Sequence, residues 1–190
     1  MTNEPTQTTL VGPDDRDIRT VVADPPWSCE SGGGQVKRGA DRHYSLLQPR
    51  QCVRVVQQEC EHWPRVAESA HLYLWTTNNA LAKGHAHHVA RHLGFEPKTL
   101  ITWVKKKDGR AQLGLGFYFR HCTEQILFCA RGETRRTDGQ PTTLLEAERE
   151  EHSAKPTETY EIIEKASPGE YLELFAREER DGWTCWGNEI

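Results

Sequence analysis

Apolar residues recur along the chain in two patterns, and each pattern predicts one kind of element. Short runs of β-branched, aromatic and aliphatic residues are typical of buried strands, whereas apolar positions three or four apart are typical of one helix face. The predicted strands are 19–23, 71–76, 99–104, 125–130 and 171–176, with a final strand or loop at 183–190. Helices are predicted from 49 to about 63, between 78 and 94, and between 156 and 168. This alternation predicts an α/β fold with a mostly parallel central sheet and helices on both faces.

Capping residues mark the ends of the predicted helices. Pro49 lies in the first turn of the first helix, where a missing N–H breaks no helical hydrogen bond. Asn78 is a candidate N-cap of the second helix, and Gly94 suits the position just past its end. Pro168 and Gly169 stop the third helix, so each helix is short and returns the chain to the sheet.

Length and composition indicate one domain. The 190 residues are enough for a core without disulfides or metal, and the polar residues 1–16 predict a flexible arm ahead of a single domain at 17–190. No apolar run predicts a signal peptide or a membrane span. The six cysteines form no C-x-x-C pair and lie among apolar neighbours, as expected in a reducing compartment. We therefore expect a cytoplasmic protein, or one of a host cytoplasm if the gene belongs to a phage.

The stretch Asp24-Pro25-Pro26-Trp27 ends the first predicted strand abruptly. Proline has no N–H and a fixed φ, so the stretch predicts a rigid loop at the carboxyl end of a strand, where open α/β sheets bind ligands. A carboxylate, free backbone carbonyls and a flat indole suit a planar base that carries an amino group. The alternative is a structural turn with the indole packed in the core, and the sequence leaves both open.

Three groups of basic residues interrupt a chain whose formal net charge is −4, which excludes a generally basic nucleic-acid coat. The first group lies in a glycine-rich segment, Cys29 to Tyr44, that predicts a mobile lid. All three are expected in loops, either as solvated tips or, if they share one rim, as a footprint for phosphates. The groups are Lys37, Arg38 and Arg42; Lys105, Lys106, Lys107 and Arg110; and Arg131, Arg135 and Arg136.

Motifs in a fixed order from Val21 to the C-terminus resemble the DPPW-type N6-adenosine methyltransferases, the MT-A seventy-kilodalton subunit family, in its prokaryotic or phage form. The Asp24–Trp27 signature is followed by Tyr44, Leu74–Thr76, Ile101–Lys105, His121–Glu124, His152–Pro156, Leu172–Arg177 and Trp186–Glu189. The resemblance implies a Rossmann-like class I methyltransferase in permuted order, with the catalytic strand early and cofactor-binding elements late. It agrees with the lack of a G-x-G-x-x-G loop, which a dinucleotide-binding fold would require.

The resemblance also implies roles for individual residues, with S-adenosylmethionine as the cofactor and no metal. Asp24 and the Pro25 carbonyl would accept hydrogen bonds from the adenine amino group, and Trp27 would stack on the flipped base. The implied catalytic residues are Asp24, Pro25, Pro26 and Trp27; the cofactor-binding residues are Asp24, Lys155, Phe175, Arg177, Asn188 and Glu189; and the substrate-binding residues are Tyr44, Lys37, Arg38 and Lys105.

Two details of this assignment stay open. Glu189 stands where the messenger-RNA enzymes carry an amide, although a carboxylate also suits a ribose diol. The family has an acidic residue upstream of the catalytic strand that contacts the cofactor adenine, and Asp14, Asp15 and Asp17 are all candidates.

The expected partner is nucleic acid, DNA rather than RNA, with a homodimer or a partner subunit possible. A catalytically silent binding subunit and a methyltransferase acting on a free nucleotide or other small amine are the alternatives. The i,i+4 pair His88 and His92 could bind zinc, but it lacks a third ligand at suitable spacing and reads as a solvated helix face.

Overall fold

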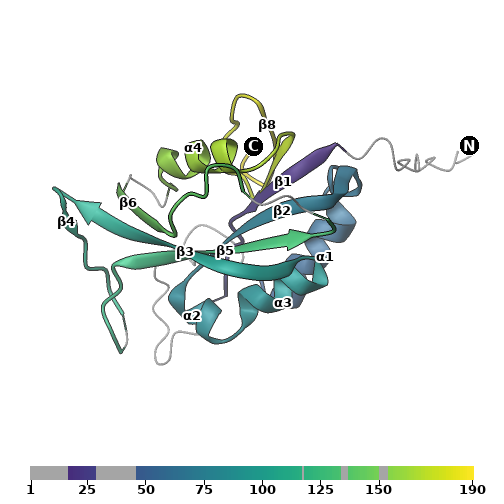
Figure 1. The fold of residues 1–190 in the computed structure, drawn as a ribbon. Coiled ribbons are helices and arrows are strands. Elements are labelled where there is room, and N and C mark those ends of the chain that lie inside the picture. Colours follow the sequence, from purple (N-terminus) through teal and green to yellow (C-terminus); the bar gives the residue numbers. More distant parts are fainter. Residues whose placement is uncertain (1–16, 29–45, 117, 134–136, 150–153) are drawn as a thin grey trace, which may run out of the picture.

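A computed structural model describes residues 17–28, 46–116, 118–133, 137–149 and 154–190 (Figure 1). The predicted arm and lid, with Lys37, Arg38 and Tyr44, lie outside these residues. In the described part of the chain, eight strands form one sheet in the order β4-β3-β5-β2-β1-β7-β8, and β6 pairs with β3. The strands are β1 (Ile18–Ala23), β2 (Val66–Thr76), β3 (Glu96–Lys107), β4 (Arg110–Ala111), β5 (Thr123–Arg131), β6 (Leu144–Glu148), β7 (Tyr171–Leu174) and β8 (Trp183–Trp186).

Six of these eight strands run in one direction. β1 is parallel to β2 and β7, β7 is parallel to β8, and β3 is parallel to β6. β5 runs antiparallel between β2 and β3, so these two neighbours are parallel to each other, and the short β4 is antiparallel to β3. The mostly parallel sheet is therefore confirmed, while the antiparallel β5 and the strands β4 and β6 were not predicted.

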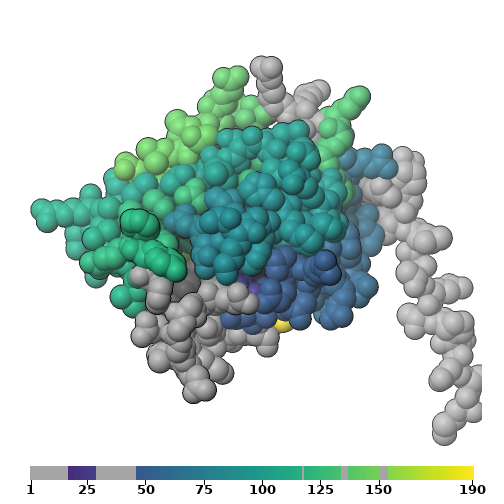
Figure 2. Space-filling model, turned by 90° about the horizontal axis from the view of Figure 1, so that it is seen from below, coloured from purple at the N-terminus to yellow at the C-terminus, as the bar shows by residue number. Residues whose placement is uncertain are grey.

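Helices cover both faces of the sheet, as predicted. Helices α1 (Pro49–Glu59), α2 (Asn78–Ala82) and α3 (His85–His92) lie below it in Figure 1, and α4 (Thr157–Ala166) lies above it. Seen from below, α1 to α3 form the blue and teal surface of the molecule (Figure 2). Val21 packs in the core on the α1 and α3 face and Val22 in the core on the α4 face. β1 is thus buried on both sides, which explains the apolar run Val21–Ala23 at its end.

The second predicted helix is in fact two helices. Gly84 adopts a φ of 74° and separates α2 from α3, a conformation that glycine takes without steric cost. The N-cap is Thr77 rather than Asn78, because the Thr77 side chain accepts a hydrogen bond from the backbone N–H of Ala80 at 3.1 Å. Gly94, with a φ of 84°, ends α3 as predicted. The first helix ends at Glu59, and a separate 3₁₀ turn follows at Trp63–Arg65.

Candidate active site

Asp24 lies at the point where the strand order of the sheet reverses. From β1 the chain crosses to β2 on one side, whereas β7 and β8 lie on the other side of β1. The backbone N–H of Asp24 donates to the Leu174 carbonyl at the end of β7, at 3.3 Å. The carboxyl ends of parallel strands at such a switch point form the usual ligand site of an open α/β sheet.

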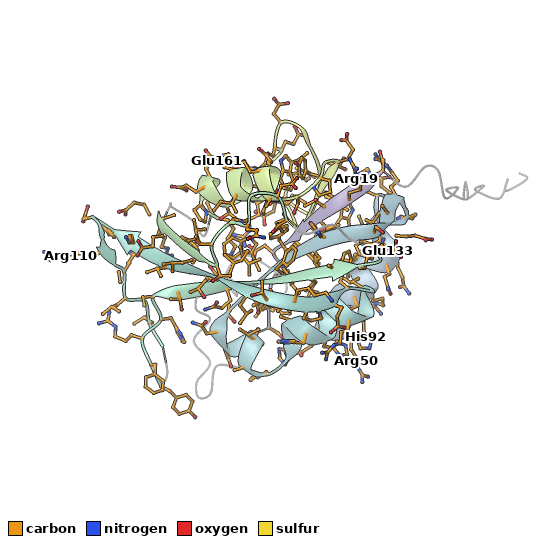
Figure 3. All side chains as sticks on the ribbon, viewed as in Figure 1. Arg19, Arg50, His92, Arg110, Glu133 and Glu161 are labelled. Carbon is orange, nitrogen blue, oxygen red and sulfur yellow. The ribbon has the colours of Figure 1, made fainter. Side chains whose placement is uncertain are left out.

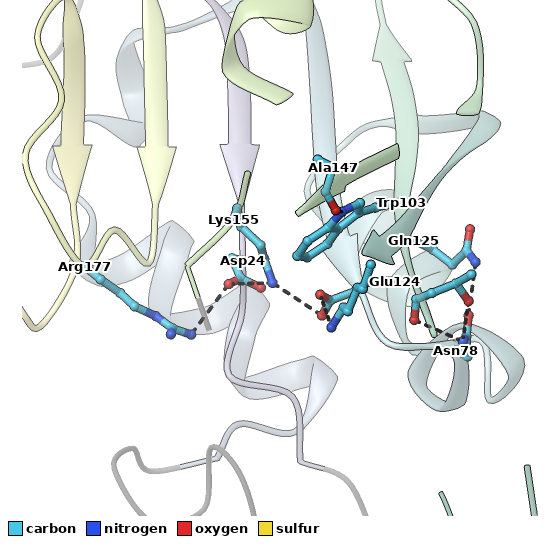
Figure 4. A network of polar contacts seen from close by, with 10 residues as sticks. Asp24, Asn78, Trp103, Glu124, Gln125, Ala147, Lys155 and Arg177 are labelled. Carbon is cyan, nitrogen blue, oxygen red and sulfur yellow. Dashed lines mark hydrogen bonds and ion pairs between the residues drawn. The ribbon is translucent and has the colours of Figure 1, made fainter. Parts of the chain in front are cut away.

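Five charged side chains alternate in sign across this edge, and we call them the charge chain: Arg177, Asp24, Lys155, Glu124 and Lys105 (Figure 4). Lys155 Nζ lies 3.1 Å from Asp24 Oδ2 and 3.3 Å from Glu124 Oε1. Arg177 lies 3.6 Å from the same Asp24 Oδ2, and Lys105 Nζ lies 3.0 Å from Glu124 Oε2. Three cations thus hold two carboxylates, and the five residues of the charge chain carry a formal net charge of +1.

Burial and pairing act in opposite directions on the charge chain. The Lys155 side chain is only 10 % exposed. Burial disfavours its charged form, but the carboxylates of Asp24 and Glu124 outweigh burial and raise the pKa of Lys155. Burial likewise disfavours the Glu124 carboxylate, but the ammonium groups of Lys155 and Lys105 lower the pKa of Glu124. Both groups are therefore charged at neutral pH.

Glu124 is a site residue to which the sequence assigned no role. It appeared only as the end of the His121–Glu124 motif, because no local pattern shows that β5 inserts antiparallel beside β3. That register pairs Glu124 with Trp103 and brings its carboxylate to the same edge as Asp24. The one feature of the sequence that could have indicated a role for Glu124 is that it is a single acidic residue directly before the mostly apolar strand 125–130.

The structure places Trp27 in the core, and its stacking on a flipped base stays a prediction. The ring is 6 % exposed, and its indole N–H donates to the Trp75 carbonyl at 2.9 Å. Backbone hydrogen bonds also link the strand end to a later segment, because Leu47 N–H donates to the Pro26 carbonyl and Ser28 N–H donates to the Leu47 carbonyl. Trp27 therefore anchors the Asp24–Trp27 tip against β2, which is the structural alternative.

The loops after β7 and β8 meet closely beside Asp24. The Ala176 N–H donates to the Trp186 carbonyl at 3.0 Å, and a Cβ on Gly187 would lie 2.1 Å from the Ala176 carbonyl oxygen. Phe175 has a φ of 62°, a strained conformation for an aromatic residue, and its ring packs against Trp186. These contacts bring the Phe175–Arg177 and Asn188–Glu189 segments side by side, with Asn188 and Glu189 exposed.

The described members of the second and third basic groups do not share one rim, while Lys37, Arg38, Arg42, Arg135 and Arg136 lie outside the described residues. Lys105 and Lys106 belong to strand β3, not to a loop, and pair with Glu124 and Glu146 at 3.0 Å each. Arg131 lies at the far end of β5 from Glu124, about 25 Å away at the usual rise per residue. Its guanidinium donates to the carbonyls of Val66 and Ala67, so it stabilises the fold.

Asp17 is not placed to contact a cofactor near Asp24. It precedes β1, at the opposite end of that strand, and its carboxylate accepts from Arg65 at 2.6 and 3.1 Å. The hydrogen bond from Arg65 lowers the pKa of Asp17. Asp14 and Asp15 lie outside the described residues.

The histidines of α3 lie apart from this site. His88 and His92 stack with ring centroids 3.9 Å apart, and His92 points away from the body of the protein (Figure 3). Within the described ranges, no group of three histidine, cysteine or acidic side chains is placed to hold a metal ion. The described part of the chain also has no helix long and apolar enough to cross a membrane.

The mixed sheet, its switch point and the acidic tip after β1 define a Rossmann-like methyltransferase fold. The chain belongs to the MT-A70 family, whose model matches residues 18–189. The observed strand order agrees with the permuted arrangement, because the Asp24 strand comes first and β7 and β8 come last.

Curated relatives include both eukaryotic and bacterial proteins. The N(6)-adenosine-methyltransferase MT-A70-like protein of Arabidopsis thaliana is 27 % identical over 180 residues, which are 90 % of this chain and 23 % of the relative. The N(6)-adenosine-methyltransferase catalytic subunit METTL3 of Homo sapiens is 27 % identical over 181 residues, 90 % of this chain and 28 % of the relative. The type II methyltransferase M.MunI of a Mycoplasma species is 33 % identical over 128 residues, 65 % of this chain and 52 % of the relative. The chain thus spans about a quarter of the eukaryotic relatives' length.

Proposed function

We propose that this chain transfers a methyl group from S-adenosylmethionine to the N6 amino group of adenine in nucleic acid. The observation that carries the proposal is the Asp24 carboxylate, held at the switch point by Lys155 and Arg177. Both cations contact Oδ2, and no described residue donates a hydrogen bond to Oδ1. We therefore assign Oδ1 to the adenine amino group. Membership of a family with relatives named N(6)-adenosine-methyltransferases supports this choice of acceptor.

The residues around Asp24 fit the cofactor. Lys155 and Arg177 suit its carboxylate, the exposed Asn188 and Glu189 suit its ribose hydroxyls, and Phe175 offers an apolar wall. The close approach of Gly187 to Ala176 leaves no room for a side chain between these loops, so they form one continuous cradle. S-adenosylmethionine would supply the methyl group as an electrophile.

The residues of the chain act on the amino group by positioning it. The adenine N6 lone pair is delocalised into the ring, which makes the nitrogen a weak nucleophile. A hydrogen bond from the amino group to Asp24 Oδ1, with a second to the Pro25 carbonyl, would orient the nitrogen and stabilise positive charge that develops on it. The nitrogen then loses its extra proton to solvent, so no metal and no covalent intermediate is required.

DNA is the acceptor that we favour. The identity with the bacterial type II methyltransferase is 33 %, against 27 % with the two eukaryotic relatives described above. Lys105, at the end of the charge chain, would approach a phosphate, and Lys37, Arg38 and Tyr44 stay predicted substrate-binding residues outside the described part of the chain. The five described cysteines are all free thiols, which supports a reducing, cytoplasmic location.

A second copy of the chain is the protein partner that we propose. The connection from β4 to β5 carries large apolar side chains that are mostly exposed, and a hydrogen bond from Gly114 N–H to the His121 carbonyl, at 2.7 Å, closes it as a hairpin. The exposed fraction is 81 % for Leu115, 86 % for Tyr118 and 82 % for Phe119. Exposed apolar groups of this size mark interaction surfaces. Arg120 braces the hairpin by donating to the Leu113 carbonyl at 3.1 Å.

A silent partner subunit is the main competing function. Such a subunit needs no carboxylate at the switch point, yet here Asp24 is held by two cations and Lys155 is shared with Glu124. This arrangement favours the catalytic role. A methyltransferase for free nucleotides would need no affinity for nucleic-acid polymers. The same experiment distinguishes it from a nucleic-acid methyltransferase.

The deciding experiment measures transfer of labelled methyl from S-adenosylmethionine to duplex DNA, single-stranded DNA, RNA and free adenine nucleotides in parallel. Mass spectrometry identifies the product as N6-methyladenine. Asp24→Asn should abolish transfer without loss of fold, and Asp138→Asn, at an exposed position, should have no effect. Cofactor binding without transfer to any polymer or nucleotide would reject the catalytic proposal.

A further inference from the structure

Trp75 lies directly beneath Lys155, at the centre of the charge chain. It is the residue before the last of β2, and its side chain is fully buried. Lys155 Nζ stands over the indole ring, 4.8 Å from the ring centroid. In the sequence Trp75 belongs to the Leu74–Thr76 motif, to which no role was assigned, and in the structure its buried ring forms the floor beneath Lys155.

The indole completes the surroundings of the Lys155 ammonium. An ammonium has three N–H groups, and two carboxylates receive it at 3.1 Å and 3.3 Å. A lysine has a flexible stem and a compact charge, so two carboxylate contacts alone do not fix its position. The negative π face of an indole on the buried side attracts the same charge.

A second tryptophan repeats the arrangement beside the first. Lys105 Nζ stands over Trp103 at 5.0 Å, and the rings of Trp75 and Trp103 meet edge to face at 5.9 Å. Trp103 is fixed by its N–H, which donates to the Ala147 carbonyl at 3.1 Å. The Trp75 backbone is tied to the acidic tip through its hydrogen bond from Trp27. Because the Trp75 and Trp103 rings are fixed in place, they can fix the positions of the ammonium groups above them.

The Trp75 N–H shows that apolar bulk alone does not explain this residue. It is buried, and no described residue accepts a hydrogen bond from it. A buried indole N–H normally has a partner, and one without a partner is unfavourable, so a phenylalanine would serve a purely apolar core better. Indole has the strongest π face among the aromatic side chains, which is the property that a cation above it uses.

We infer that Trp75 is a positioning residue of the proposed adenine-methylating site: its ring holds the Lys155 ammonium between Asp24 and Glu124, and thereby orients the Asp24 carboxylate. This inference rests on the proposed function for its catalytic consequence, but not for the contact itself. The charged groups around Lys155 are Asp24 from the end of β1 and Glu124 from β5, with Arg177 and Lys105 one step further along the charge chain.

The test compares Trp75→Leu and Trp75→Phe with a matched control, Tyr73→Leu. Tyr73 is buried on the same core face two residues earlier in β2, but it packs against Phe128 and bonds Ser167. The first readout is the NMR spectrum of lysine labelled at Cε, assigned with Lys155→Arg. A proton above an indole face is shielded, so the Lys155 Hε signals should lie upfield in the wild type. They should return towards ordinary lysine values in Trp75→Leu and stay upfield in Tyr73→Leu.

The second readout is methyl transfer. Trp75→Leu should lower kcat about tenfold and move the alkaline limb of the pH–rate profile to lower pH, and Trp75→Phe should restore part of both. Tyr73→Leu should change neither kcat nor the pH–rate profile when it is as stable as Trp75→Leu. An unchanged Lys155 signal in Trp75→Leu, or equal effects in Tyr73→Leu, would overturn the inference. If Trp75→Leu does not fold, the same two measurements on Trp75→Phe test the inference. If the wild type transfers no methyl group, the proposed function fails, but the NMR signal of Lys155 still tests the contact with Trp75.

Discussion

Lys155 donates to Asp24 across 3.1 Å, and this contact joins the segment before α4 to the end of β1. The same ammonium reaches Glu124, so one nearly buried cation serves two carboxylates from different strands. Because these side chains are largely buried, removing one partner leaves an uncompensated charge, which costs more than the pair itself contributes. The contact between Lys155 and Asp24 therefore both stabilises the fold and orients the Asp24 carboxylate.

Replacing Lys155 should damage both properties. Lys155→Met should lower the free energy of unfolding by about 3 kcal/mol, because Asp24 and Glu124 lose their shared cation. Methyl transfer should fall by about 100-fold or more, as when an oriented electrostatic group is lost from an active site. Urea unfolding and initial rates measure the two effects. Lys165→Met, at a largely exposed ion pair, is the control and should change neither. A stable and active Lys155→Met variant would contradict this assignment.

Glu124 should make stability depend on acid pH. Its pKa is lowered in the folded protein, so its stabilising effect is complete above the unfolded value of about 4.3 and is lost as the pH falls through the folded value. Urea unfolding at stepwise pH should show the wild type losing stability more steeply than Glu124→Gln below about pH 4.3. At neutral pH the variant should be the less stable protein. Glu61→Gln, at an exposed position, should run parallel to the wild type, and parallel curves for Glu124→Gln would count against the charge chain.

The sequence was most informative where local chemistry decides the structure. The apolar run before Asp24 and the two prolines after it were enough to place a buried strand and the loop that follows it, and β1 ends at Ala23. Gly94 ended its helix because a left-handed residue terminates any helix. The break at Gly84 was not predicted, because an isolated glycine inside a helical pattern is usually tolerated and does not by itself indicate that the helix ends.

Tertiary packing decided what the sequence left open. Whether Trp27 stacks on a base or packs in the core depends on what lies opposite the ring, and here it is the end of β2. Glu124 has no local signal because its place follows from the antiparallel register of β5 between two parallel strands. The sequence assigned Lys155 to the cofactor site, which stays a prediction, but it could not show the two carboxylate partners of Lys155, which come from segments 31 or more residues away.

The contact between Gly187 and Ala176 should be necessary for cofactor binding. A methyl group at position 187 would lie within 2.1 Å of a backbone oxygen, so the loops after β7 and β8 must separate. Gly187→Ala should lower the free energy of unfolding by about 2 kcal/mol and weaken S-adenosylmethionine binding at least about tenfold, measured by calorimetry. Gly182→Ala is the matched control on the β7–β8 connection, because its Cβ meets open space and only its φ of 76° is strained. It should cost about 1 kcal/mol and leave affinity unchanged. Equal affinity in both variants would show that the cradle lies elsewhere.

The apolar hairpin between β4 and β5 should control self-association. Tyr118→Ser combined with Phe119→Ser removes two rings that are mostly exposed, so the fold should keep its stability. The wild type should sediment as a dimer at micromolar concentration and the double variant as a monomer, because the lost apolar area is what the second copy would bury. Leu144→Ser, at another exposed apolar position on β6, should leave the dimer intact. A monomeric wild type, or a double variant that still dimerises, would exclude this hairpin as the interface and leave its exposed rings to another partner.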